Sequence, residues 1–135
     1  MTPAISIAGQ RISVDAPPYV IAEISANHNG KLDTALRIID AAKVAGASAV
    51  KLQTYRPDTI TLNSDAEPFR IRGGLWDGRT LYDLYEQAHM PWEWHAVLFE
   101  HARNRGITIF SSPFDNTAVD LLESLDAPAY GLIFI

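Results

Sequence analysis

Charged and polar side chains interrupt or end three short apolar runs in this sequence. Glu23 interrupts the first run, Lys51 and Gln53 lie near the end of the second, and Ser111 and Ser112 end the third. A charge in a buried strand is costly unless it is paired, so we expect Glu23 and Lys51 to pair with each other or with a ligand. Strands in this order would supply an acid, a base with an amide, and two hydroxyl groups to one site.

Each of these side chains also has a purely structural interpretation. Glu23 and Lys51 could form an ion pair that has no function, and Gln53 could satisfy the backbone of a loop. The run Ser111-Ser112-Pro113 could be a turn that leads into a helix. His28 lies in a polar loop with an asparagine on either side, where it could stabilise the loop or contact a ligand.

The remaining histidines and two of the tryptophans are weaker candidates. We expect His95 and His101 on a helix outside the sheet, far from the strand ends. Neither these two nor His89 has the i, i+4 spacing with a carboxylate that is typical of a zinc-binding helix. Trp92 and Trp94 are interpreted as packing residues, because a platform for nucleic-acid bases would need basic neighbours. No metal site is expected from this chain alone.

The elements that position these residues alternate between strands and helices. Apolar runs predict strands, and apolar residues at helical spacing predict helices. A hairpin is expected first, on either side of the pair Gly9-Gln10, because glycine supplies the positive φ of a tight turn. The connection 55–79 is expected to be a long polar loop, a kind that is often functional. The predicted strands are 19–24, 48–54, 107–111 and 129–135, and the predicted helices are 32–45, 80–88, 91–105 and 115–125.

This order of elements predicts an α/β fold with parallel strands and right-handed helical crossovers. A doubly wound sheet and a (β/α)₈ barrel both satisfy it, although the first strand lacks the glycine-rich phosphate fingerprint of a dinucleotide fold. In a barrel, the carboxyl ends of the strands form the face where active sites are built. We divide the chain into a hairpin, 1–16, and a barrel-type domain, 17–135.

Composition excludes several classes of protein. The chain has 135 residues, no cysteine and a formal net charge of −5. It therefore has no disulfide framework and no thiol nucleophile, and its charge disfavours binding to nucleic acid or to an anionic membrane. It begins without a signal-peptide pattern, and no apolar stretch reaches the roughly 20 residues that span a bilayer. We expect a cytoplasmic location.

Five stretches carry a resemblance to the sialic acid synthase family. YVIAEISANHNG (19–30), VKLQTY (50–55) and FSSPFD (110–115) resemble the family's first three strand motifs. GGLWDGRTLYDLY (73–85) and PWEWH (91–95) are closer to the pseudaminic acid branch than to N-acetylneuraminate synthases. Any one motif would be weak, but together they are specific and cover nearly the whole chain.

The resemblance implies an enzyme that condenses phosphoenolpyruvate with an amino sugar. Carbon 3 of phosphoenolpyruvate attacks the aldehyde of a 2,4-diacetamido-trideoxy hexose, water adds at carbon 2, and phosphate leaves to give a nonulosonic acid. In the family a divalent metal, Mn²⁺ or Mg²⁺, polarises the aldehyde. The metal ligands are not expected in this chain, and full-length relatives are homodimers.

The resemblance also implies roles for individual residues. Glu23 and Lys51 would be catalytic, with Lys51 binding the anionic phosphoenolpyruvate and Glu23 contacting the sugar. The residues that bind substrate would be Gln53, Ser112, Asn29 and Tyr55, with Gln53 on the sugar and Ser112 on phosphoenolpyruvate.

The predicted fourth strand departs from the family pattern. After Ala129-Tyr130, the family's lysine and serine are replaced by Gly131 and Phe134, and its glutamate is absent. A barrel needs about 250 residues, so we expect about half of a TIM barrel, its N-terminal portion. We expect this chain to be a truncated synthase, inactive alone.

Other functions stay open at this point. The chain could belong to an N-acetylneuraminate or legionaminate synthase, although Trp76 stands near the place of an asparagine that reaches the sugar in N-acetylneuraminate synthases. It could be another sugar-phosphate barrel, such as an epimerase or an aldolase with Lys51 as a Schiff-base lysine. It could also be a non-catalytic half barrel that pairs with another chain.

Overall fold

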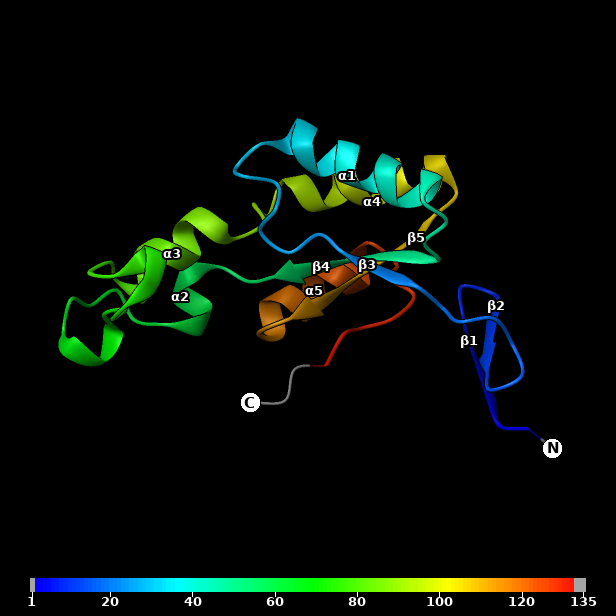
Figure 1. The fold of residues 1–135 in the computed structure, drawn as a ribbon, viewed down its shortest axis with the longest axis horizontal. Helices are drawn as coiled ribbons and strands as arrows, with labels where there is room; N and C mark the ends of the chain where they lie inside the picture. The colour runs from blue at the N-terminus through cyan, green and yellow to red at the C-terminus, as the bar shows by residue number, and fades with distance from the viewer. Residues whose placement is uncertain (1, 133–135) are drawn as a thin grey trace.

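The centre of the molecule is a parallel sheet. The structure is a computed structural model that describes residues 2–132. The sheet has three strands in the order β3-β4-β5, namely β3 (Ile21–Glu23), β4 (Ala49–Thr54) and β5 (Thr108–Pro113). Both strand pairs are parallel, so their carboxyl ends meet at one edge (Figure 1). The predicted α/β class with parallel strands is confirmed.

Three helices cover the sheet. They are α1 (Leu32–Val44), α4 (Trp94–Arg105) and α5 (Asn116–Ser124). In Figure 1, α1 and α4 lie side by side over the same part of the sheet, and α5 packs against β5. The apolar residues of α1 and α4 fall at helical spacing and form one core with Val50 and Leu52 of β4. Gly106 ends α4 at a φ of 67°, in the left-handed region that glycine adopts without strain.

The two faces of β4 have different surroundings. Val50, Leu52 and Thr54 are fully buried on the face that meets the helices. Lys51 and Gln53 point the other way, because successive side chains of a strand alternate, and they are only partly buried. Lys51 and Gln53 therefore lie on the face of the sheet that the helices leave free.

A separate antiparallel pair precedes the sheet. β1 (Ala4–Ile7) pairs with β2 (Gln10–Ser13). The turn is formed by Ala8 and Gly9, which have φ values of 48° and 82°. Gln10 is already the first residue of β2, so the expected turn at Gly9-Gln10 is wrong by one residue. Two consecutive positive φ values are typical of the tight turns that match the twist of paired strands.

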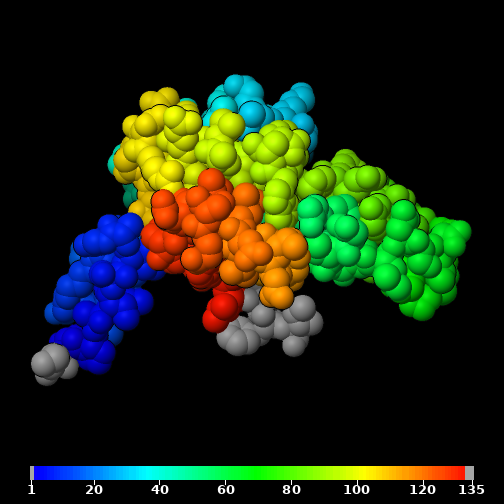
Figure 2. Space-filling model, turned by 180° about the vertical axis from the view of Figure 1, so that it is seen from behind, coloured from blue at the N-terminus to red at the C-terminus, as the bar shows by residue number. Residues whose placement is uncertain are grey.

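The connection 55–79 is not the unstructured loop that the sequence predicts. It contains α2 (Pro57–Ile60), η1 (Glu67–Phe69) and η2 (Gly74–Trp76), and it leads into α3 (Leu81–Ala88). Ile71 donates its N–H to the carbonyl of Arg79 at 2.9 Å and accepts from Gly78 at 2.9 Å. These local bonds satisfy the backbone without a strand or a long helix. Figure 2 shows this segment projecting from one end of the body and the hairpin from the other.

Other boundaries also differ from the prediction. β3 covers only part of the predicted strand 19–24, and Val20 and Ile21 are 53% and 40% exposed, because β3 is an edge strand with one neighbour. α4 begins at Trp94 and not at residue 91, after a turn in which the Trp94 N–H donates to the carbonyl of Pro91. No helix among the described residues combines the length and the apolar character that crossing a membrane requires.

The predicted fourth strand, 129–135, is described only in part. Tyr130 forms an isolated parallel bridge with Ser111, and the Gly131 N–H donates to the carbonyl of Ser111 at 2.9 Å. Phe134 and the rest of 133–135 lie outside the described residues. The chain thus continues the sheet beyond β5 by one bridge.

Replacing Asp115 tests how α5 begins. Its carboxylate accepts from the Ala118 N–H at 3.1 Å and the Thr117 N–H at 3.2 Å, as an N-cap does. We expect Asp115→Ala to lower the free energy of unfolding by about 1 kcal/mol, because the N-terminal donors lose their acceptor. Urea denaturation followed by circular dichroism measures this change. Asp115→Asn keeps an acceptor oxygen and should lose less than half as much; an equal loss would contradict the capping role.

Candidate functional site

An ion pair links the two central candidates. Glu23 and Lys51 are register partners in β3 and β4, and Lys51 Nζ lies 2.7 Å from Glu23 Oε1. Of the two partners that the sequence leaves open, each other or a ligand, the structure shows Glu23 and Lys51 paired with each other. The site is more open than expected, since the Glu23 side chain is 49% exposed on the edge strand. A pair this exposed contributes only about 0–1 kcal/mol to stability, so stability alone does not account for its position.

Gln53 and Ser112 join this pair on the same face of the sheet. They are register partners, and Gln53 is two residues beyond Lys51 in β4. A Cβ atom on Gly131 would overlap Ser112 Oγ and would lie 3.3 Å from Lys51 Cδ. The side chains of Lys51 and Ser112 therefore converge on the same point. Glu23, Lys51, Gln53 and Ser112, which we call the strand-end group, occupy the carboxyl ends of all three strands.

The strand-end group combines opposite charges with neutral donors. The Lys51 ammonium is a compact charge with three N–H donors, which suits a phosphate or carboxylate. Gln53 and Ser112 can donate hydrogen bonds to the same ligand. Glu23 can accept a proton or a hydrogen bond. The arrangement can thus hold an anion beside a group that exchanges protons.

Ser111 does not belong to this group, contrary to the prediction of two hydroxyl groups at one rim. Its side chain lies on the opposite face of β5, is fully buried, and bonds Thr54 Oγ1 at 2.6 Å. Thr54 Oγ1 in turn lies 2.9 Å from His95 Nε2. Ser111 and Ser112 separate because adjacent residues of a strand point to opposite faces.

His95 lies on a helix outside the sheet, as the sequence predicts, but it is not far from the strand ends. It is fully buried against the end of β4, because α4 begins beside that strand end and turns its first residues inward. His95 Nδ1 lies 3.1 Å from the carbonyl of Pro91 and 3.2 Å from that of Trp92, so Nδ1 carries the proton and donates. Nε2 therefore accepts from Thr54. Burial lowers the pKa of His95, which keeps the ring neutral.

Tyr55, two residues beyond Gln53, packs among aromatic side chains. It is 6% exposed and packs edge-on against Tyr85 and Phe114, at ring-centroid distances of 5.8 and 5.1 Å. Burial raises the pKa of its phenol to about 12. The structure therefore places it in an aromatic cluster, although the resemblance implies contact with substrate.

His28 and Asn29 follow β3 in the next loop. His28 is fully buried, accepts from the Gly30 N–H at 3.0 Å and meets Trp94 edge-on at 5.4 Å. Burial lowers its pKa, and the contacts favour the loop-stabilising interpretation. Asn29 is exposed, with a φ of 51°, and it lines a cavity of about 400 Å³ with Trp76.

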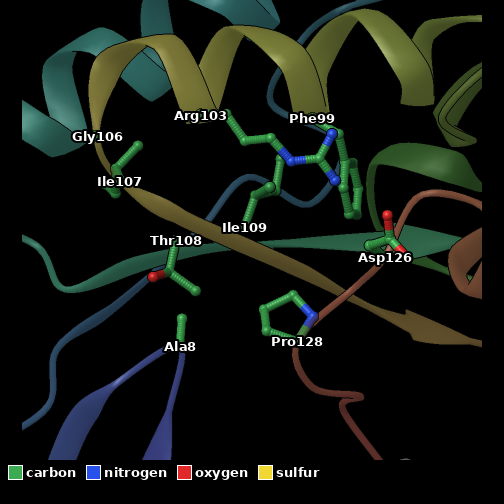
Figure 3. A pocket seen from close by; sticks show the side chains of 9 residues that line it. All are labelled: Ala8, Phe99, Arg103, Gly106, Ile107, Thr108, Ile109, Asp126 and Pro128. Carbon is green, nitrogen blue, oxygen red and sulfur yellow. The ribbon is translucent and has the colours of Figure 1, made fainter.

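A second cavity, of about 300 Å³, lies at the other end of the sheet (Figure 3). Thr108, the first residue of β5, lines it together with Ala8 of the hairpin and with Phe99, Arg103, Asp126 and Pro128. Ser112 is four residues further along the strand, about 13 Å away at the usual rise. This cavity is therefore separate from the strand-end group.

The described residues do not fit a metal site. Within residues 2–132, no group of three or more histidine, aspartate or glutamate side chains is arranged to hold an ion. His101 and Arg105 both contact Asp40 at 2.7 Å, which joins α4 to α1.

Comparison with known proteins identifies the family. The NeuB family profile matches residues 38–132, which include Lys51, Gln53 and Ser112. The chain belongs to the NeuB family. The resemblance to sialic acid synthases in the sequence is thereby confirmed.

Relatives of this NeuB-family chain include two curated enzymes. It is 56% identical to the pseudaminic acid synthase of Campylobacter jejuni over 118 aligned residues. The aligned region covers 87% of this chain. The chain is 54% identical to the pseudaminic acid synthase of Helicobacter pylori over 114 aligned residues, and this aligned region covers 84% of the chain. The chain spans about a third of the length of these relatives, 34% of each.

A solved structure has the same fold. The N-acetylneuraminic acid (sialic acid) synthetase of Leptospira borgpetersenii, solved in complex with citrate, superposes with a TM-score of 0.73 at 27% identity. The match covers 93% of this chain and 39% of that one. The parallel sheet of this NeuB-family chain is therefore of the kind found in sialic acid synthases.

Acidification tests the neutral state of His95. Its pKa is lower in the folded chain than the unfolded value of about 6.5, so the unfolded chain binds the proton first as the pH falls. We expect full stability above this value, a decline as the pH drops through it, and no further decline from this group below the folded-state pKa. Urea denaturation at several pH values measures the decline.

Two variants separate the histidines in that experiment. His95→Asn should reduce the loss of stability on acidification. Burial also lowers the pKa of His28, so His28→Asn should remove the part of that loss that comes from His28. An unchanged pH profile in His95→Asn would contradict a neutral, buried His95.

Packing at Gly131 tests whether the described part of the tail meets the strand-end group. Gly131→Ala should cost about 1–3 kcal/mol of stability, because the new Cβ overlaps Ser112 Oγ. In the double variant with Ser112→Ala, the loss should be smaller than the sum of the single losses. Additive losses in urea denaturation would show that the two positions do not touch.

Proposed function

We propose that this chain carries the phosphoenolpyruvate-binding part of a nonulosonic acid synthase of the pseudaminic acid type. The observation that supports this most directly is the strand-end group, in which Lys51 and Ser112 converge beside Glu23. Identity of 56% to an enzyme named pseudaminic acid synthase supports the choice of reaction. It exceeds the 27% identity to the N-acetylneuraminic acid synthetase, which argues against the alternative that the chain belongs to an N-acetylneuraminate synthase.

In the proposed reaction, carbon 3 of phosphoenolpyruvate bonds to the aldehyde carbon of a 2,4-diacetamido-trideoxy hexose. The aldehyde oxygen takes up a proton and becomes a hydroxyl group. Water adds at carbon 2 of phosphoenolpyruvate and loses one proton. The carbon–oxygen bond to phosphate then breaks, as the new hydroxyl group at carbon 2 becomes a carbonyl and gives its proton to the departing phosphate. The products are a nine-carbon acid and inorganic phosphate. A legionaminate synthase would perform the same steps on another diacetamido sugar, so the acceptor distinguishes the two.

Lys51 and Ser112 would hold phosphoenolpyruvate. The Lys51 ammonium is oriented by Glu23 before substrate arrives, which lowers the cost of ordering it. An ammonium fixed in this way stabilises the negative charge of the bound phosphate and carboxylate.

Glu23 and Gln53 would face the sugar. The Gln53 amide can donate to the aldehyde oxygen as it gains negative charge. Glu23, freed from Lys51 as the anion takes its place, can accept the proton that the attacking water loses. Asn29 and Tyr55 stay proposed substrate contacts from the resemblance, with Asn29 better placed because it is exposed.

We also propose that β3, β4 and β5 are the first strands of a (β/α)₈ barrel, with the strand-end group on its inner face. The bridge from Ser111 to Tyr130 supports a fourth strand at the expected position. The hairpin within 1–16 would precede the barrel in 17–135. Gly131 provides no ammonium where the family has a lysine, so this chain would bind phosphoenolpyruvate but not complete the reaction alone. Homodimers and a cytoplasmic location stay predictions.

Binding of phosphoenolpyruvate tests the proposal. We expect the purified chain to bind it in isothermal titration calorimetry, and Lys51→Met to weaken binding at least tenfold through loss of a charged donor. Lys43→Met is the matched control, because Lys43 contacts the carbonyl of Gly106 at the other end of the sheet. Equal affinity in Lys51→Met and Lys43→Met would overturn the proposed role.

Turnover separates the remaining functions. With phosphoenolpyruvate, the diacetamido sugar and Mn²⁺, we expect no phosphate release from this chain beside an active full-length relative. Sugar-dependent release would show that a complete site forms. Borohydride trapping of a sugar on Lys51 would instead indicate an aldolase. Failure to bind phosphoenolpyruvate would favour a non-catalytic assembly module.

A further inference from the structure

A line of hydrogen bonds lies on the helix side of the sheet, directly behind the strand-end group. It connects three side chains, His95 of α4, Thr54 of β4 and Ser111 of β5, which we call the polar chain. All three side chains are fully buried. Apolar side chains of similar size could fill the same space without leaving any polar group to satisfy, so packing alone does not explain these residue types. The steps proposed above give them no role.

Two backbone carbonyls fix the direction in which each hydrogen bond is donated. His95 Nδ1 donates to the carbonyls of Pro91 and Trp92, so Nε2 has no proton and accepts from the Thr54 hydroxyl at 2.9 Å. The Thr54 proton is then in use, and Ser111 must donate in the 2.6 Å contact between the two hydroxyl groups. Each hydroxyl group therefore has one orientation. A buried network with all its bonds satisfied makes the surrounding structure rigid.

The polar chain and the strand-end group are connected through the backbone. Gln53 precedes Thr54 in β4, and Ser112 follows Ser111 in β5. Adjacent side chains of a strand point to opposite faces, so a bond between Thr54 and Ser111 on one face constrains the backbone that carries Gln53 and Ser112 on the other. Gln53 and Ser112 are register partners, whereas Thr54 and Ser111 lie diagonally across the same two strands. A diagonal bond changes length when one strand slides along the other, so it resists this sliding.

Ser112 depends on this arrangement more than Gln53 does. Ser112 is 2% exposed, and its hydroxyl group is one bond from Cβ, so the β5 backbone sets the direction in which the hydroxyl group can donate. The Gln53 side chain is longer and can adjust to a small shift of its strand. A change in the polar chain should therefore reach a ligand mainly through Ser112.

We infer that His95 and Thr54 are positioning residues for phosphoenolpyruvate, an inference that rests on the proposed function. They hold β5 in the register and rotation at which the Ser112 hydroxyl group meets the anion bound to Lys51. Neither residue touches the ligand, and both act through Ser112. The helix end supplies the fixed point, because the His95 ring is anchored to two backbone carbonyls.

Two substitutions of Thr54 test the inference. Thr54→Val keeps the shape of the side chain but removes the hydroxyl group, which breaks both bonds of the polar chain. We expect it to weaken phosphoenolpyruvate binding about tenfold in isothermal titration calorimetry, because the Ser112 hydroxyl group loses its alignment with the anion. Thr54→Ser keeps the hydroxyl group and should restore most of the affinity. Ser111→Ala, which removes only the last bond, serves as the second variant if Thr54→Val does not fold.

A double-variant cycle shows whether the effect passes through Ser112. Ser112→Ala removes the hydroxyl group that the polar chain is inferred to position. Adding Thr54→Val to Ser112→Ala should then weaken binding less than about twofold, because the two losses are not additive. A polar chain that only stabilised the fold would weaken binding by the same factor with Ser112 present or absent, and that result would overturn the inference.

Leu98→Ala is the matched control for a general loss of stability. Leu98 is a fully buried core residue of α4, three residues beyond His95, and it is not part of the polar chain. Urea denaturation of each variant identifies conditions in which all of them are folded. Under those conditions Leu98→Ala should bind phosphoenolpyruvate as the unsubstituted protein does. A loss as large as that of Thr54→Val would show that any damage to the core weakens binding, contrary to the inference.

The remaining outcomes separate the inference from the proposed function. If Lys51→Met weakens phosphoenolpyruvate binding but Thr54→Val and Ser111→Ala do not, the inference fails and the role of Lys51 stands. If the unsubstituted protein does not bind phosphoenolpyruvate, the inference and the proposed function both fail.

Discussion

The position of β4 between β3 and β5 is the constraint on which the rest of the structure depends. In a strand the side chains alternate, so the register of β4 decides at once which residues enter the core and which face away from it. Val50, Leu52 and Thr54 meet the helices, while Lys51 and Gln53 lie beside Glu23 and Ser112. A shift by one residue would bury the Lys51 ammonium and expose the apolar residues. Core packing and the chemistry of the strand ends are therefore determined by the same register.

The polar chain from Ser111 through Thr54 to His95 supports this register from the helix side. All three side chains are buried. Removing one of them would leave its partner with an unsatisfied polar group, which would lower the stability of the fold. These hydrogen bonds connect β5, β4 and the first turn of α4 at the strand ends. They thereby fix the backbone that carries Gln53 and Ser112, although none of the three side chains faces the strand-end group. Polar contacts on one face of the sheet thus help to position polar groups on the other.

Two sets of groups with different chemistry lie near the strand ends. The strand-end group contains the charges and has an ammonium suited to an anion, whereas the cavity near Trp76 is neutral and has amide and apolar walls. The loop after β3 connects them, because it starts at Glu23 and ends in the cavity wall. The segment 55–88 supplies the other wall only because it folds into short helices and turns instead of a loose loop.

The sequence by itself determined the alternation of strands and helices and the family, and it indicated that Glu23 and Lys51 need partners, either each other or a ligand. These follow from local patterns, since apolar periodicity and strand-end residues need no knowledge of distant contacts. Only the tertiary structure decided that Ser111 and Ser112 face opposite sides, that His95 is buried against Thr54, and that Tyr55 packs among aromatic rings. It also brought Trp76 and Gln87 together with Asn29 in the lining of one cavity. Such positions depend on exact strand boundaries and on where a helix begins over the sheet, and contacts between distant residues set both.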